Sequence, residues 1–138
     1  MRPAMSIGKV LAVGAALVAG LAVAASIWLN PPAENRARAM DSQRLWRISR
    51  IESAINNHYR LHQKLPANLE ELTIDLAPEN LRDPGTGQTF EYEAVGERGY
   101  RLCAVFERSA DVEPNRSYGR RYKAGRDCFE EKVKAPGE

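Results

Sequence analysis

The feature that most limits the possible folds of this chain of 138 residues is an apolar run at residues 10–29. The run carries no charge, and Trp28 near its end suits the interface of a membrane. As a helix rising about 1.5 Å per residue it would span roughly 30 Å, the thickness of a bilayer's hydrocarbon core. The rest of the chain is too short to enclose such a helix in a soluble core. The run therefore predicts a membrane helix.

Two interpretations of this helix stay open. A secretory signal peptide needs a basic start and a small-x-small cleavage site, which Arg2, Lys9 and Ala22-Val23-Ala24 supply. The run is longer than the roughly 7–15 apolar residues of an ordinary signal peptide, and this favours an uncleaved anchor. We therefore expect a short N-terminal segment (1–9) and a transmembrane anchor (10–29). Cleavage, giving a secreted or periplasmic protein, is the alternative.

Two signals disagree on which side of the membrane the rest of the chain lies. Two basic residues precede the run, and five follow it closely: Arg36, Arg38, Arg44, Arg47 and Arg50. By the positive-inside rule, this places the following residues in the cytoplasm. Against it, Cys103 and Cys128 are the only cysteines, and a pair in a small exported domain most simply forms one disulfide. We side with export, to the periplasmic face of a bacterial inner membrane.

The charge balance says little about partners but excludes one class. The whole chain has 20 Lys and Arg against 18 Asp and Glu, and the two basic residues before the apolar run account for the difference. A protein that binds nucleic acid generally shows a clear basic excess. A nucleic-acid partner is therefore not expected.

A long amphipathic helix is predicted over residues 42–63, capped by Asp41 or Ser42. Pro31-Pro32 ends the apolar helix before it, because proline cannot donate a backbone hydrogen bond and restricts its predecessor. Residues 30–41 are then a short polar linker or a ragged helix start. Apolar or aromatic residues recur at three- and four-residue steps along one face: Leu45, Ile48, Ile51, Ile55, His58, Tyr59 and His62. The other side carries Arg44, Arg47, Arg50 and Asn57.

Turn signals and alternating residues predict a small antiparallel sheet after this helix. Asn68 and Glu71 form a capping box for a short second helix. Asp83-Pro84-Gly85 suits a tight turn, in which Asp83 bonds its own backbone. Two strands joined by a loop at 95–99 then place one apolar face on the long helix through Phe90, Tyr92, Ala94, Tyr100, Leu102, Ala104 and Phe106.

The opposite face of the second strand carries Cys103, and residues 126–130 are the candidate third strand that brings Cys128 to it. A Cys103–Cys128 disulfide would close a loop of about 25 residues, a stabilisation of roughly 3–4 kcal/mol. The expected fold is α+β: a membrane helix, then a long helix packed on a small antiparallel sheet with one disulfide. The extracytoplasmic domain is expected over 42–133, with a disordered tail at 134–138.

This order of elements resembles the type IV pilins and the major-pseudopilin-like proteins of type II secretion. The matching residues lie between about 42 and 107: Leu65-Pro66, Leu69, Leu72, Asp83-Pro84, Gly87, Phe90, Tyr92, Tyr100, Leu102 and Ala104. The resemblance implies an envelope protein that acts in secretion or pilus assembly. The chain departs from the family at its start, because Gly8-Lys9-Val10 replaces the prepilin processing motif and no glutamate opens the helix. Prepilin processing and filament insertion are therefore not expected.

The strongest candidate for ligand recognition is a basic run with two tyrosines. Its members could hold an anionic ligand or a protein partner: Arg116, Tyr118, Arg120, Arg121, Tyr122, Lys123 and Arg126. A solvated basic loop is the plainer interpretation. The resemblance adds a calcium candidate in the preceding residues, Asp111, Glu113 and Asn115, but their surroundings fail the EF-hand pattern.

No motif for catalysis or a cofactor is present. His58 and His62 have the four-residue spacing of a metal pair, but no third ligand lies near them in the sequence, so packing histidines are expected and no metal site is assigned. Nucleophile elbows, phosphate-binding loops and zinc-protease motifs are absent. We expect a non-enzymatic structural or interaction protein of the envelope. The alternative is a free-standing periplasmic module that binds an anionic ligand through 116–126.

Overall fold

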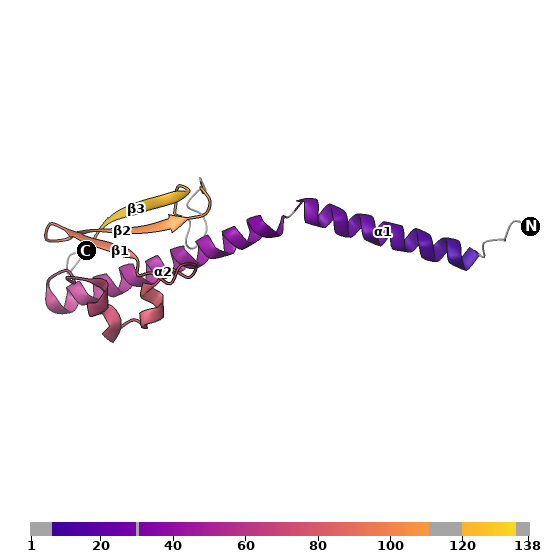
Figure 1. Ribbon diagram of the computed structural model, residues 1–138. Coiled ribbons are helices and arrows are strands. Elements are labelled where there is room, and N and C mark those ends of the chain that lie inside the picture. Colours follow the sequence, from indigo (N-terminus) through magenta and orange to yellow (C-terminus); the bar gives the residue numbers. More distant parts are fainter. Residues whose placement is uncertain (1–6, 30, 111–119, 135–138) are drawn as a thin grey trace, which may run out of the picture. The chain divides into compact units, whose positions relative to one another are not determined.

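The computed structural model describes residues 7–29, 31–110 and 120–134, which form two compact units, Met1–Arg36 and Ala37–Glu138. The helices are α1 (Ile7–Leu29) and α2 (Pro32–His62). Two 3-10 helices follow, η1 (Leu69–Ile74) and η2 (Pro78–Leu81). The strands are β1 (Glu91–Val95), β2 (Gly99–Phe106) and β3 (Gly125–Lys132), all labelled in Figure 1. The predicted class, α+β with an antiparallel sheet, is confirmed.

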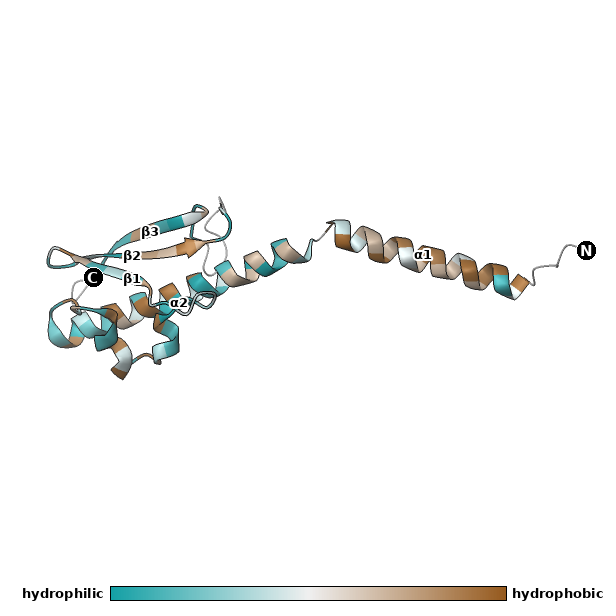
Figure 2. Cartoon of the chain, viewed as in Figure 1, coloured by the Kyte–Doolittle hydropathy of each residue, from teal (hydrophilic) through white to brown (hydrophobic). Residues whose placement is uncertain are grey.

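Helix α1 has no buried residue, and hydrophobic residues, brown in Figure 2, predominate along its length. Within the described residues it is the one helix long and apolar enough to cross a membrane, and a signal sequence would pass the same test. It ends at Leu29, and α2 begins at Pro32. The predicted break at Pro31-Pro32 is therefore confirmed, and Pro32 occupies a first-turn position, where its missing N–H costs nothing.

Helix α2 begins ten residues before the predicted start. Residues 32–41 are helical. Of the two alternatives predicted for this segment, a helix start is therefore correct and a polar linker is wrong. Asp41 lies inside the helix, and its expected role as a cap is wrong. The capping prediction failed because Asp41 is held by tertiary contacts, which the local sequence does not reveal.

The buried face of α2 matches the predicted stripe at its centre. Ile48, Ile51 and Ile55 are almost completely buried, and Ala54 joins them. The prediction is wrong at both ends of the stripe: His62 is exposed, and Arg44, expected on the polar side, is buried. Gln63, just after the helix, takes the left-handed conformation at φ 55°, and its N–H bonds the carbonyl of Tyr59.

The sheet has the strand order β1-β2-β3, and both pairs are antiparallel. The turn between β1 and β2 lies at the predicted place, and β3 contains the predicted third strand. One face of the sheet lies on α2, as Figure 1 shows for this unit. Its inward residues complete one core with the helices: Tyr100, Leu102, Ala104, Phe106, Phe129 and Val133.

The segment between α2 and the sheet closes the open side of this core. Asn68 caps η1 by accepting from the N–H of Glu71, and the Glu71 carboxylate accepts from the N–H of Ala67. The two helices bury Leu69, Leu72 and Leu81. The capping signal thus indicated the right place, although the element is a 3-10 helix and not an α-helix.

Candidate functional site

The structure separates the residues of the predicted basic site. Arg116 and Tyr118 lie outside the described residues, as do the calcium candidates Asp111, Glu113 and Asn115. Arg120 faces the helix side of the sheet, where it is shared by two carboxylates. Its guanidinium lies 2.6 Å from Glu52 on α2 and 2.8 Å from Glu131 on β3. Arg120 also lies over the ring of Phe129, at 4.6 Å from its centroid.

Two further members of the run also have intramolecular partners. The ring of Tyr122 stacks on Phe106 at 4.3 Å and is partly buried against the core. Arg126 lies on the outer face of the sheet and pairs with Glu91 at 2.6 Å. Arg121 and Lys123 are exposed and make no ion pair with any described residue. Of the described members, these two alone have free cationic side chains for an outside anion.

A buried ionic cluster that the sequence did not reveal ties α2 to the turn and to the end of β2. Arg44, 4% exposed, donates to Asp83 at 2.7 Å and to Asp41 at 2.8 Å. Asp41, fully buried, also accepts from the backbone N–H groups of Glu107 and Arg108. One arginine thus joins three segments that are far apart in the sequence.

The predicted turn at 83–85 supplies the other half of this cluster. The Asp83 carboxylate accepts from the N–H groups of Gly85 and Thr86, so the predicted bonding of Asp83 to its own backbone is confirmed. A side chain at Gly85 would meet the Arg44 guanidinium at 2.8 Å, so this position needs glycine for space. Burial raises the pKa of Asp83, but hydrogen bonds from Arg44 and the two N–H groups outweigh it, and the pKa lies below its usual value.

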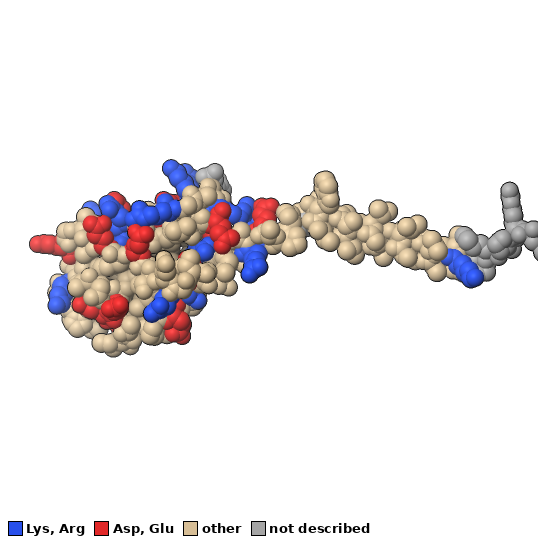
Figure 3. Space-filling view, viewed as in Figure 1, with Lys and Arg blue, Asp and Glu red and all other residues tan. Residues whose placement is uncertain are grey.

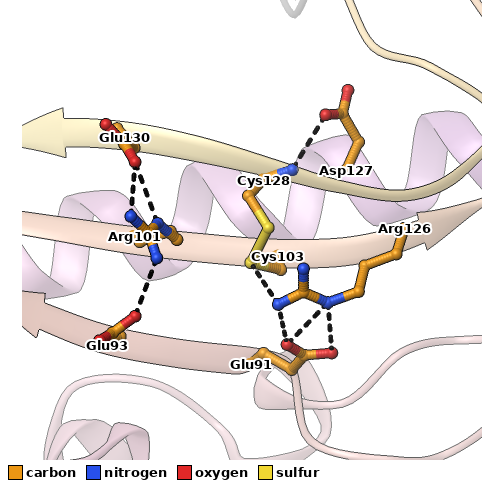
Figure 4. Close-up of a disulfide and its surroundings, with 8 residues drawn as sticks. All are labelled: Glu91, Glu93, Arg101, Cys103, Arg126, Asp127, Cys128 and Glu130. Atoms are coloured by element: carbon orange, nitrogen blue, oxygen red, sulfur yellow. Dashed lines mark hydrogen bonds and ion pairs between the residues drawn. A yellow bond between two sulfur atoms is a disulfide. The ribbon is translucent and has the colours of Figure 1, made fainter.

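The outer face of the sheet carries the disulfide between two ionic clusters, in the view of Figure 4. Cys103 and Cys128 are directly opposed residues of β2 and β3, and their Cα atoms are 4.0 Å apart. On one side, Arg126 donates hydrogen bonds to the Glu91 carboxylate and also to Cys103 Sγ, the latter at 3.4 Å. On the other side, Arg101 lies between two more carboxylates, Glu93 and Glu130. The predicted disulfide and the outward direction of Cys103 are confirmed.

The rings of His58 and His62 lie in contact, with centroids 4.4 Å apart and planes tilted by 41°. The nearest carboxylate oxygen to His58 Nε2 is that of Glu71, at 3.8 Å, beyond hydrogen-bond distance. Burial, and then the charge of His62, lower the pKa of His58. No group of three or more metal-ligating side chains is found in the described part of the chain. His62 is exposed, and the pair is assigned no ligand.

Comparison with known proteins finds nothing similar: no protein-family model, curated protein or solved structure matches this chain. Function must therefore be argued from the residues. The exposed surface of the second unit mixes positive and negative side chains, as Figure 3 shows for one face. Most of the charges described above are neutralised by partners in the same chain, so they do not form one continuous cationic site.

Proposed function

We propose that the chain is a single-pass, membrane-anchored protein of the bacterial envelope, with its α+β domain in the periplasm. It acts by recognition and not by catalysis, as a pilin- or pseudopilin-like structural component or an accessory of secretion or pilus assembly. The observation that carries this proposal is the Cys103–Cys128 disulfide in a small domain that follows an exposed apolar helix. Disulfides of this kind persist in oxidising compartments and are rare in the cytosol.

The pilin-like part of the proposal is supported by the order and packing of the elements. A long helix lays one apolar face on an antiparallel sheet, and the Asp83-Pro84 turn lies just before the first strand. The buried Arg44 cluster holds that turn against α2. This arrangement leaves the outer face of the sheet free to meet another protein.

Mass spectrometry of the mature chain tests the anchor. We expect the start to be intact, because the prepilin motif is missing and the apolar run is long. Loss of all residues up to about Ala24 would show a cleaved signal peptide and would contradict the proposed anchor. Loss at Gly8 would show prepilin processing and make the chain a filament subunit.

The alternative is a module that binds an anionic ligand, and the exposed Arg121 and Lys123 favour it. If it is correct, changing both residues to serine should abolish retention on immobilised heparin at low salt, because the phosphate- or sulfate-binding charge is lost. The matched control changes Lys132 and Lys134, which are equally exposed. Equal retention of the two double variants would exclude this site.

A further inference from the structure

The two sulfurs of the disulfide have different surroundings. Cys103 is 4% exposed, and its Sγ accepts a hydrogen bond from Arg126 Nη2 at 3.4 Å. Cys128 is more exposed, and its Sγ has no hydrogen bond to any described residue. Figure 4 shows Arg126 reaching back along the outer face to the Cys103 side of the bond.

The position of Arg126 is fixed by a second contact. The Glu91 carboxylate, on β1, accepts from Arg126 Nε and Nη2 at 2.6–3.2 Å. Glu91 offsets part of the positive charge, but a guanidinium nitrogen and not the carboxylate is bonded to the sulfur. The other charged group of this face, Arg101 with Glu93 and Glu130, has no hydrogen bond to either sulfur.

This asymmetry decides how such a disulfide reacts with a thiol. Exchange proceeds by attack of a thiolate on one sulfur, and the other sulfur leaves as a thiolate. A cation at hydrogen-bond distance stabilises a thiolate and makes it the better leaving group. At this site the sulfur beside the guanidinium belongs to Cys103, and Cys128 is the more exposed of the two residues.

We propose that Cys103–Cys128 is a polarised thiol-exchange site, at which a dithiol reductant attacks Cys128 and displaces Cys103 as a thiolate beside Arg126. The S–S bond breaks, its electron pair stays on Cys103 Sγ, and a mixed disulfide forms on Cys128. The second thiol of the reductant then attacks the mixed disulfide and releases Cys128. The reductant ends as a disulfide, and its two protons end on Cys103 and Cys128.

The strands joined by the disulfide also have other contacts. β2 and β3 are paired over eight residues, from Gly99–Lys132 to Phe106–Gly125, independently of the sulfur link. The core lies on the other face, where Leu102 and Phe129 are buried. The backbone pairing of β2 with β3 and the core on the other face therefore do not depend on the sulfur–sulfur bond for their contacts.

The test uses the oxidised full chain in detergent, with reduced glutathione as the probe thiol. After brief exposure the reaction is quenched with acid, free thiols are alkylated, and peptides are analysed by mass spectrometry. We expect the glutathione adduct on Cys128 and the alkyl group on Cys103 in about tenfold excess over the reverse. Equal amounts, or an excess of adduct on Cys103, would overturn the proposal.

Three variants tie the preference to the guanidinium. Arg126→Gln should reduce the excess to near unity, and Arg126→Lys should keep part of it. Arg101→Gln, which removes another arginine from the same face that has no hydrogen bond to either sulfur, should leave it unchanged. A preference that persists in Arg126→Gln would contradict the assigned role. Because the isolated chain is used, these results do not depend on membrane orientation, and their failure would leave the proposed anchoring intact.

Discussion

Arg44 lies at the centre of the buried ionic cluster of the domain. It is buried between Asp41 and Asp83, with Glu107 at 3.4 Å. Removing one partner of a buried ion pair leaves an uncompensated charge and costs about 3–5 kcal/mol. We therefore expect Arg44→Ala to lower the free energy of unfolding by about that amount, measured by urea unfolding in detergent with tryptophan fluorescence. Arg50→Ala is the control, because Arg50 is exposed over Trp46 and should cost less than about 1 kcal/mol.

The same cluster predicts a pH dependence at Asp83. The pKa of this group is held below its usual value of 3.8 in the folded state, so its stabilisation is complete above that value and is lost as the pH falls through the folded pKa. Asp83→Asn cannot titrate. We expect the difference in unfolding free energy between wild type and Asp83→Asn to be largest near about pH 5 and to shrink below the usual pKa. If this difference in unfolding free energy stayed constant from pH 5 to 2, the charge of Asp83 would make no contribution to stability.

At the scale of the elements, α2 is followed directly by a residue whose backbone is strained. Gln63 has φ 55°, a conformation that glycine adopts freely and that costs other residues about 1 kcal/mol. We expect Gln63→Gly to raise the free energy of unfolding by roughly 0.5–1 kcal/mol. Lys64→Gly is the matched control, since Lys64 is exposed and has no positive φ; there glycine should be neutral or destabilising. Equal effects of the two changes would refute this account of the helix end.

The sequence predicted those elements whose sequence patterns are local, and it failed where contacts between distant residues decide the structure. Periodicity located the buried isoleucines of α2, alternation located the strands, and the cysteine pair gave the disulfide. The buried Asp41 and Arg44 were missed because periodicity assigns charged residues to the solvent side, and their partners come from distant segments. The basic run looked continuous in sequence, but Arg120 and Arg126 are held on opposite faces of the sheet by different carboxylates.

At the scale of the whole molecule, two features disagree about the side of the membrane on which the domain lies. The arginines that follow the apolar run favour the cytoplasm, and the disulfide favours the outside. The structure gives two of these five arginines another role: Arg44 is buried with two aspartates, and Arg47 donates to the carbonyls of Glu79 and Arg82. An arginine that the fold requires would be present on either side of the membrane. It is therefore weaker evidence for membrane orientation than an arginine with no structural role. The disulfide is therefore the better guide to location.

This argument predicts that both cysteines are oxidised in living cells and that the C-terminus lies outside the cytoplasm. Cells are treated with an alkylating agent before lysis, and the mass of the full chain is measured with and without prior reduction. We expect alkylation of Cys103 and Cys128 only after reduction, because an exported domain meets an oxidising compartment. A reporter that is active only outside the cytoplasm, fused after Glu138, should be active, and the same reporter before Met1 should not. Free thiols together with an inactive C-terminal fusion would place the domain in the cytosol and remove the basis of its envelope role.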